Sequence, residues 1–228
     1  MLDWERNWRG AGVVYVVLLI VAFVIYGDQP KLGASDADLV SFYDGDRTRI
    51  LIAAIIFCFA FLELLWFGAA LSSVLRDAGM GGWAAAATAS SAALAAMLFL
   101  RMTVRAGLAF SIAGSGHPQI TSGLADFAYA LTVIASFPAA MFVMSGAFGL
   151  ARAGVISSRF FSVGALAVVL VLLGGTTWAS NGFWAPDGAF ALIAQIVFLV
   201  WMGVLSGFLV MRSPAPSGAP DRATVPAA

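Results

Sequence analysis

Residues 50–75 read ILIAAIIFCFAFLELLWFGAALSSVL, and Glu63 is the only charged residue among them. A helix needs about 20 consecutive, predominantly apolar residues to cross the hydrocarbon core of a bilayer. This run exceeds that length and therefore predicts a membrane-spanning helix. Further apolar runs lie on both sides of it, and we expect six spans in all, at about 11–26, 50–75, 83–112, 124–150, 160–180 and 188–211.

The composition of the whole chain also indicates that lipid is its solvent. Of the 228 residues, 61% are hydrophobic and 11% are charged, and the mean hydropathy is +0.95. Soluble domains are about 45–50% apolar and about 25% charged, so one small globule could not hide this much apolar surface from water. The predicted fold class is all-α and polytopic, with one six-helix transmembrane domain at residues 1–211. The proline-rich residues 212–228 are predicted to be a disordered cytoplasmic tail.

Lys and Arg indicate which loops are cytoplasmic, because such loops carry an excess of both residue types. With the N-terminus inside, three basic residues lie outside, at Lys31, Arg47 and Arg49, against seven arginines inside. Both termini are therefore predicted to be cytoplasmic. The first run is predicted to stay uncleaved, since no small-residue cleavage site closely follows Tyr26. The seven inner arginines are Arg6, Arg9, Arg76, Arg152, Arg159, Arg212 and Arg222.

A short helix is predicted in the first outer loop, where Ser35 and Asp38 have the spacing of a capping box. Its apolar residues Leu39, Phe42 and Tyr43 would share one face, and we expect that face to lie on the outer membrane surface. The alternative is a solvated loop with a single turn, because the segment is shorter than three helical turns.

Three features predict how the spans pack and begin. Small residues fill 84–93, which lets neighbouring helices approach closely, so the third span is expected at the centre of the bundle. Asp187 precedes the last span and is expected to cap its N-terminus. Gln195, two turns further on, is expected to hydrogen-bond between helices rather than to contact a ligand.

Glu63 is the clearest ionisable residue within a predicted span. A carboxylate near the middle of a bilayer is costly, so it must be protonated or paired. Glu63 is either a proton or substrate site, or a neutral acid that links two helices by a hydrogen bond.

Arg101 and Arg105 are four residues apart and therefore project from one face of the third span. Their depth depends on which end of the long apolar run is taken as the reference. At the shallower depth they reach the headgroups or form an outer salt bridge. At the greater depth Arg101 lies level with Glu63 and could pair with it.

A polar stripe runs down one side of the fourth span and consists of Asp126, Tyr129, Thr132 and Ser136. Together with Glu63, Arg101 and Arg105, it suggests an outward-facing polar cavity between the second, third and fourth spans. The alternative has no cavity: Asp126 bridges Arg105, and the hydroxyl groups bond to their own helix.

Several function classes have no support in the sequence. The net charge is zero and the pI about 6.5, so no basic surface is expected to bind nucleic acid. A single cysteine, Cys58, and a single histidine, His117, exclude an internal disulfide and any His-pair metal or haem site. No nucleotide-binding loop, metal cluster or nucleophile–base pair is found. We therefore predict no cofactor, no metal and no catalytic residue, and an enzyme is the less favoured class.

The layout resembles a group of uncharacterised six-span bacterial integral membrane proteins. The features that carry this resemblance are the acidic outer loop ending in SFYDGDRTR at 41–49, the end of the second span, LSSVLR at 71–76, and APDGAF at 185–190. The resemblance covers nearly all of the chain up to Met211. It implies a compact six-helix bundle in a bacterial plasma membrane and brings no established activity or site residues.

Three functions are compatible with these features. The first, which the sequence favours because no complete chemical motif is present, is a small membrane module that acts through protein or helix partners, or as a homo-oligomer, among membrane lipids. The second is a carrier or binder of a small amphipathic or lipid-like molecule. The third is an enzyme that acts on a lipid headgroup through Arg101, Arg105, His117 and Asp126, since arginines suit phosphate recognition.

Overall fold

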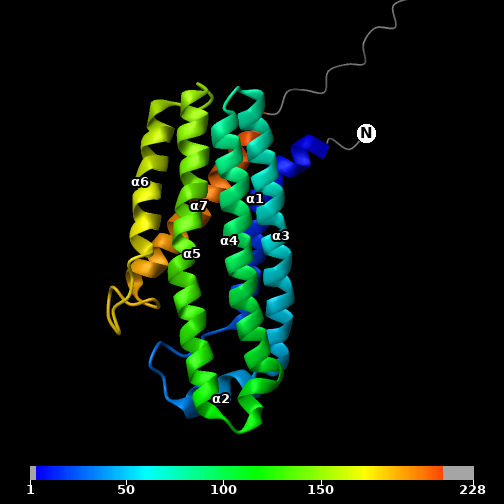
Figure 1. Cartoon of the computed structure of the whole chain (residues 1–228). Coiled ribbons are helices and arrows are strands. Elements are labelled where there is room, and N and C mark those ends of the chain that lie inside the picture. The colour runs from blue at the N-terminus through cyan, green and yellow to red at the C-terminus, as the bar shows by residue number, and fades with distance from the viewer. Residues whose placement is uncertain (1–3, 213–228) are drawn as a thin grey trace, which may run out of the picture.

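The computed structural model describes residues 4–212, and every regular element within them is helical, which confirms the predicted all-α class (Figure 1). A π-helical turn at Leu108–Ile112 and a 3₁₀ turn at Ala113–Ser115 follow α4. The α-helices are α1 (Trp4–Tyr26), α2 (Asp36–Gly45), α3 (Arg47–Asp77), α4 (Gly81–Gly107), α5 (Pro118–Arg152), α6 (Ser158–Gly174) and α7 (Ala189–Met211).

Six of these helices form a closed ring. Around it, α1 packs on α3, α3 on α4, α4 on α5, α5 on α6, α6 on α7, and α7 returns to α1. The prediction that the third span is central is wrong, because α4 is one member of the ring between α3 and α5. Its small residues bring α3 close instead: Gly68 lies against Ser91, with no room for a side chain at Gly68.

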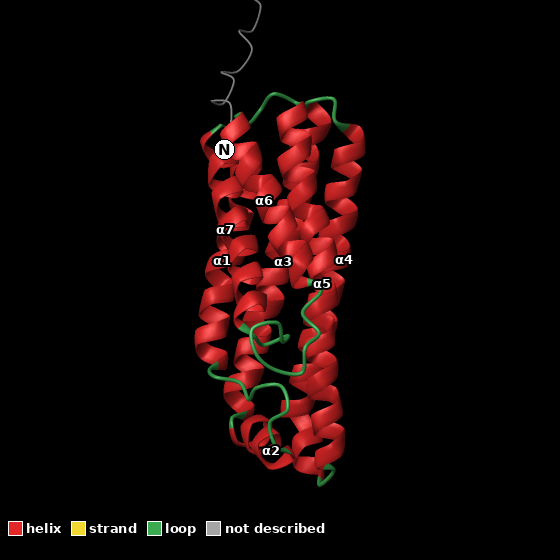
Figure 2. Ribbon diagram, turned by 90° about the vertical axis from the view of Figure 1, so that its left-hand side faces the viewer, coloured by secondary structure: helices red, strands yellow, loops and turns green. Residues whose placement is uncertain are grey.

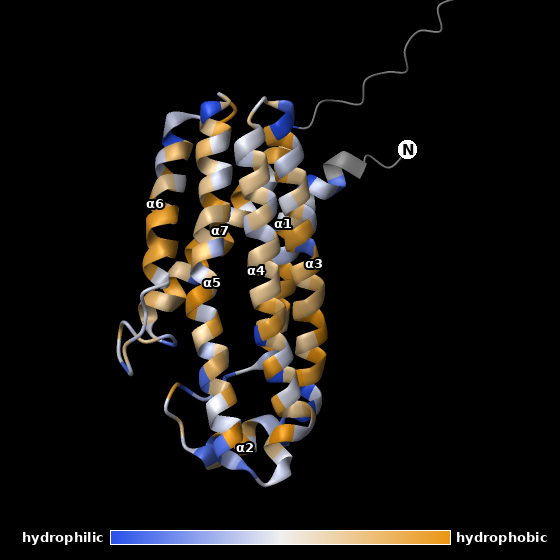
Figure 3. Ribbon diagram, in the orientation of Figure 1, coloured by the Kyte–Doolittle hydropathy of each residue, from blue (hydrophilic) through white to orange (hydrophobic). Residues whose placement is uncertain are grey.

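Five helices are long and apolar enough to cross a bilayer: α1, α3, α4 with the turns that follow it, α5 and α7. Apolar side chains also cover the outside of the ring, where Val24, Phe59, Val163 and Leu192 are each more than half exposed. Figure 3 shows hydrophobic colours along the helices and hydrophilic ones mainly near the two ends. The chain is therefore a multi-pass membrane protein.

The predicted fifth span, 160–180, is too long at its C-terminal end, because α6 ends at Gly174. The hydroxyl groups of Thr176 and Thr177 bond back to the carbonyl oxygens of Leu173 and Gly174, at 2.7 and 2.8 Å. Those carbonyl groups are thus satisfied without a further helical turn. The rest of the run forms the loop at 175–188, which leaves α6 with 17 residues and below the length of the five long helices.

The short helix α2 lies across one end of the bundle (Figures 1 and 2). The Ser35 hydroxyl accepts a 3.2 Å hydrogen bond from the Asp38 amide, which confirms the predicted helix start. The expected membrane contact of its apolar face is wrong. Leu39, Phe42 and Tyr43 are buried, and α2 packs on α5 and on the turns that follow α4. This packing is possible because α3, α4 and α5 continue beyond the end of α6 (Figure 1).

The start of α1, at Trp4, and the end of α7, at Met211, lie at the opposite end of the bundle from α2, together with the turns at 78–80 and 153–157 (Figure 1). Arg212 is the last described residue, and its Nη1 donates a hydrogen bond to the Val155 carbonyl oxygen at 2.5 Å. The predicted tail otherwise lies outside the described residues.

Candidate binding cavity and arginine cluster

A cavity of about 90 Å³ lies in the middle of the ring, and all six ring helices contribute side chains to it. One water molecule needs about 10–15 Å³ of such space. The cavity therefore has room for a slender, single-chain group rather than for a bulky ligand.

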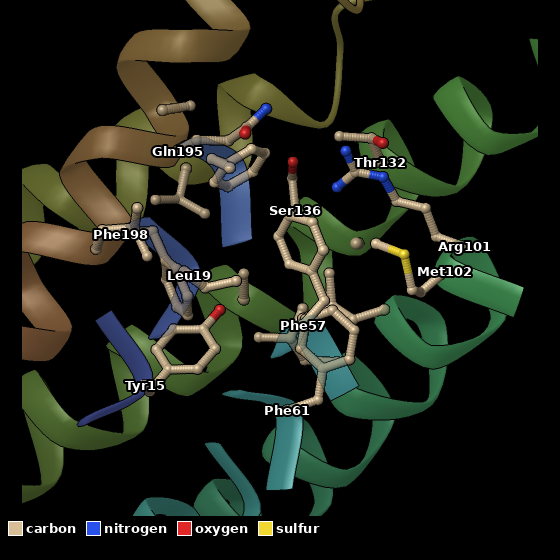
Figure 4. Close-up of a pocket in the computed structure, with 18 residues that line it drawn as sticks. Tyr15, Leu19, Phe57, Phe61, Arg101, Met102, Thr132, Ser136, Gln195 and Phe198 are labelled. Atoms are coloured by element: carbon tan, nitrogen blue, oxygen red, sulfur yellow. The ribbon is translucent and has the colours of Figure 1, made fainter. Parts of the chain in front are cut away.

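One end of the cavity is aromatic (Figure 4). Phe57 and Phe61 of α3 stack at 6.2 Å between ring centroids, and Tyr15 of α1 meets Phe198 of α7 edge to face at 6.4 Å. Leucine and alanine side chains of α4, α5 and α7 fill the spaces between these rings. This end offers an apolar surface to whatever enters the cavity.

The other end is polar and carries Arg101, Thr132, Ser136 and Gln195 (Figure 4). The Thr132 hydroxyl donates to the Ala128 carbonyl oxygen at 3.0 Å, which leaves its lone pairs as acceptors. The Arg101 Nε atom is buried and has no hydrogen-bond partner, and no described carboxylate lies within ion-pair distance of its guanidinium group. The polar end therefore presents a positive charge with nothing in the described chain to balance it.

Arg105 lies one helical turn beyond Arg101, towards α2, and is only 2% exposed. Its Cζ atom is 5.4 Å from the centroid of the Tyr26 ring and 6.0 Å from that of Tyr129. These are cation–π contacts, in which the negative face of a ring attracts the guanidinium charge. The expected headgroup contact or outer salt bridge is wrong for Arg105, because aromatic rings from α1 and α5 enclose it.

The hydroxyl of Tyr129 fastens the loop at 27–35 beside this cluster. It accepts a hydrogen bond from Gln29 Nε2 at 2.5 Å and donates one to the Pro30 carbonyl oxygen at 2.9 Å. The same loop is held a second time, because the Leu32 amide donates to Asp187 Oδ2 at 3.0 Å. The expected role of Asp187 as a helix cap is therefore wrong: α7 starts after Gly188 without a side-chain cap.

Tyr43 of α2 completes the polar surroundings of Arg105. Burial raises the pKa of its hydroxyl, and the neighbouring Tyr26 raises it further, while the charge of Arg105 acts in the opposite direction. The Tyr43 hydroxyl therefore stays protonated at physiological pH and is a hydrogen-bond donor. Here we define the arginine cluster as the set Arg101, Arg105, Tyr26, Tyr43 and Tyr129.

The structure separates the seven residues of the predicted polar cavity into three groups. Arg101, Thr132 and Ser136 line the central cavity, and Arg105 and Tyr129 lie in the arginine cluster next to it. Glu63 and Asp126 are elsewhere. The expected cavity between the second, third and fourth spans is thus replaced by one that six helices enclose and that is mainly apolar.

Glu63 is half-buried on α3, between the exposed side chains of Leu62 and Trp66. It follows Phe61 by two residues, a rotation of about 200° on a helix, and Phe61 faces the cavity, so Glu63 points away from it. Within the described residues Glu63 has no hydrogen bond or ion pair. The possible pair with Arg101 is therefore not formed.

Asp126 is exposed on α5 and does not bridge Arg105. It lies on the part of α5 before Ser136, which is the residue opposite the last turn of α6 at Gly174. Because α6 ends there, the preceding turns of α5 are not covered by it, and a carboxylate can stay solvated.

Sequence reasoning did not assign Tyr15, Gln195 or Tyr26 to a site. Tyr15 and Gln195 line the cavity, and Tyr26 encloses Arg105. Gln195 could have been found, because it is the only amide or charged side chain between 189 and 211. Tyr15 is likewise the only polar side chain between residues 13 and 25.

The fold and the cavity together define a class: an all-α, multi-pass membrane protein whose helices enclose an aromatic cavity with an arginine at one end. Among the described residues, no three His, Cys, Asp or Glu side chains are grouped so that they could hold a metal ion. No protein-family model, curated protein or solved structure matches the chain, so the resemblance to uncharacterised bacterial membrane proteins stays a prediction.

Proposed function

We propose that this protein binds a slender amphiphilic anion in its central cavity, with the apolar chain among the aromatic rings and the charged group against Arg101. The observation that carries this proposal is the Arg101 guanidinium group, which lies at the polar end of the cavity without a carboxylate partner among the described residues. Of the functions considered from the sequence, this is the binder or carrier of a lipid-like molecule.

The charge on Arg101 supports an anionic ligand. Arginine is not deprotonated in proteins, and an unpaired buried ion carries a desolvation penalty of several kcal/mol. A carboxylate or phosphate would offset this penalty through charge-assisted hydrogen bonds, which are about twice as strong as neutral ones. Thr132, Ser136 and Gln195 supply further polar groups to the lining of the same cavity.

The direction of the cavity supports an amphiphile. Its polar end is on the side of the bundle where α1 ends, at Tyr26, and its aromatic end extends towards the middle of the ring. Tyrosine is enriched at the boundary between the hydrocarbon core and the headgroups. A lipid-like molecule in this cavity would keep the orientation that it has in the surrounding bilayer leaflet.

We propose that all six ring helices cross the membrane, α6 included, and that both termini are cytoplasmic in a bacterial plasma membrane. Arginines are in excess at the end of the bundle where α1 begins and α7 ends, and this excess supports the orientation. The α2 end of the molecule, with Lys31, Arg47, Arg49 and five aspartates between residues 28 and 46, would then face outwards.

The other two functions have less support. Action through protein partners stays a prediction: exposed apolar side chains surround the ring, as lipid contact requires, and they do not single out one docking face. For a headgroup enzyme, the four residues considered are dispersed. Arg105 is buried, whereas His117 and Asp126 are exposed on different turns of α5 and its N-terminus.

Native mass spectrometry tests the proposed function. The protein is purified in dodecyl maltoside, and dodecanoate is added as an anionic single-chain probe. We expect one bound dodecanoate per chain. Arg101→Gln removes the charge that the carboxylate contacts, and we expect at least a tenfold weaker apparent affinity.

A second variant tests the apolar end, because Ala139→Leu places a larger side chain in the cavity and should also reduce binding. The matched control is Arg47→Gln, which removes an arginine that is exposed at the α2 end and lies over the Phe110 ring. The control should bind like the wild type. Equal binding by all four proteins would contradict the proposal.

A further inference from the structure

We propose that the charged group of the bound amphiphile is a phosphate, which Arg101 contacts in the cavity and whose second negative charge Arg105 balances from behind Arg101. This inference rests on the proposed function, since it names the headgroup of the ligand in the same cavity. The ligand class is a single-chain lipid phosphate, a dianion at neutral pH, rather than a fatty acid.

Two positive charges lie close together at and just beyond the polar end of the cavity. Arg101 lines the cavity, and Arg105 is on the same face of α4, one turn closer to α2. Neither arginine has a carboxylate within ion-pair distance among the described residues. The nearby Asp187 is engaged with the Leu32 amide. One carboxylate ligand would balance one of the two charges, whereas a phosphate monoester carries about −1.5 to −2 at pH 7 and would balance both.

The arginine cluster also has hydrogen-bond donors that are not used within the described part of the protein. Two buried polar atoms of the arginine cluster have no hydrogen-bond partner among the described residues, Arg101 Nε and Arg105 Nε, and the buried Tyr26 hydroxyl lies beside that of Tyr43. Buried polar groups are nearly always hydrogen-bonded, so two unsatisfied donors in one place need an explanation. A phosphate group presents three strong acceptor oxygens and matches this donor-rich cluster better than two carboxylate oxygens do.

Tyr129 bounds the arginine cluster. Tyr129 cannot supply a free donor, because its hydroxyl hydrogen already goes to the Pro30 carbonyl oxygen. With the loop at 27–35 fastened to it, Tyr129 closes the cluster on the α5 side. The phosphate therefore enters from the cavity, touches Arg101 first, and has Arg105 behind it as a positioning residue that adds a second charge.

The experiment compares three probes with equal chains, dodecyl phosphate, dodecanoate and dodecanol, on the full-length protein by native mass spectrometry. We expect the wild type to bind dodecyl phosphate at least tenfold more tightly than dodecanoate. Arg105→Gln should bring this ratio close to one, and Arg105→Lys, which keeps the charge, should retain most of it. Inorganic phosphate should compete only in large excess, because it lacks the chain.

Tyr26→Phe separates ligand binding from folding. The lost hydroxyl neighbours that of Tyr43 on α2, so the thermal stability of the variant should fall only slightly, while its affinity for dodecyl phosphate should fall severalfold. Ser162→Ala is the control, because Ser162 is exposed on α6, bonds to the Ser158 carbonyl oxygen of its own helix and does not line the cavity, so that its loss should not affect the headgroup preference.

The outcomes distinguish the two proposals. If the wild type prefers dodecanoate, or if Arg105→Gln leaves the ratio unchanged, the phosphate inference is overturned and the cavity still binds an amphiphile. If inorganic phosphate competes at equal concentration, the cluster is a site for free phosphate and the inference is again overturned. If none of the three probes binds, the proposed function itself fails.

Discussion

Ser206 of α7 connects the first and last helices of the ring. Its hydroxyl donates to the Arg9 carbonyl oxygen at 2.5 Å and accepts from the Val13 amide at 3.2 Å. The side chain is fully buried, and Gly12 lies directly against it, so that no other side chain intervenes between α1 and α7. A single hydroxyl group thus bridges two segments that are more than 190 residues apart in the sequence.

The first prediction concerns this hydroxyl. Ser206→Ala removes both hydrogen bonds, and we expect a loss of about 0.5–1.5 kcal/mol in the free energy of unfolding, in the range measured for interhelical hydrogen bonds. The measurement is unfolding in mixed dodecyl maltoside–dodecyl sulfate micelles, followed by circular dichroism. Ser162→Ala is the control, because Ser162 is exposed and bonds only to the Ser158 carbonyl oxygen of its own helix. Equal losses in both variants would show that the bridge contributes nothing.

For single residues, the sequence predicted which charged side chains lie within the helices, but not which side chains surround them. Arg101 and Arg105 were singled out because arginine is costly in a membrane span. Their surroundings could not be derived, because the rings around Arg105 belong to other helices: Tyr26 is on α1 and Tyr129 is on α5, both distant in the sequence. Glu63 was assigned to the predicted cavity for a related reason: hydropathy gives its depth along α3 but not which side of the ring it faces.

The contact of α6 with its neighbours depends on Gly164. A Cβ atom there would lie 2.6 Å from Ala147 Cβ of α5 and 2.7 Å from Trp201 Cη2 of α7. Trp201 is buried and also packs on Phe160 of α6, at 5.0 Å between ring centroids. The missing side chain therefore lets three helices meet at one level, as small residues do in membrane helix packing.

The second prediction follows from this contact. Gly164→Ala should destabilise the protein by about 1–3 kcal/mol, the usual range for overpacking a filled interior. Gly207→Ala is the matched control, since nothing lies within 4 Å of the Cβ position at Gly207 on α7. It should leave the stability within about 1 kcal/mol of the wild type. Thermal unfolding in dodecyl maltoside measures both, and a neutral Gly164→Ala would contradict the close contact.

Helix positions were largely predictable, because every apolar run except the first had the length of a span; the first, 11–26, was too short, since α1 already begins at Trp4. The end of α6 was not predictable. Glycine, threonine and tryptophan at 174–178 carry no charge and so do not mark an end of the span, whereas side-chain hydrogen bonds from Thr176 and Thr177 stop the helix. Hydropathy measures transfer into lipid and carries no information on which carbonyl groups find a partner. The short helix α2 was predicted correctly because capping is a local interaction between Ser35 and Asp38.

The ring as a whole explains why the cavity was placed between the wrong helices. Depth and polarity of each span can be estimated along the chain, but which helices surround a central space depends on how the ring closes. That closure comes from α1 and α7, the two ends of the chain, so the contributions of Tyr15 and Gln195 could not be assigned in advance.

The third prediction concerns how the molecule lies in the membrane. In a background in which Cys58, the single cysteine, is replaced by alanine, Ser115→Cys and Asp77→Cys place exposed thiols at opposite ends of the bundle. We expect a membrane-impermeant maleimide added to intact bacterial cells to label the Ser115→Cys variant. The Asp77→Cys variant should react only after the cells are opened.

Labelling of both variants in intact cells would contradict the proposed topology, and the reverse pattern would invert it. The cysteine-free background is the control for labelling of other groups. An even number of crossings is tested at the same time, because Gly154→Cys, in the turn that joins α5 to α6, should behave like Asp77→Cys.

The shortness of α6 has a consequence for the lipids around the protein. Its 17 residues span about 25 Å, some 5 Å less than a typical hydrocarbon core, whereas α3 and α4, which lie further around the ring, exceed that core. If α6 crosses the membrane as proposed, a bilayer that matches both sides must be thinner beside α6 than beside α3. The protein would then sit in a sloping patch of membrane, enriched in shorter-chain lipids along one edge, and neighbouring proteins would meet it from a preferred direction.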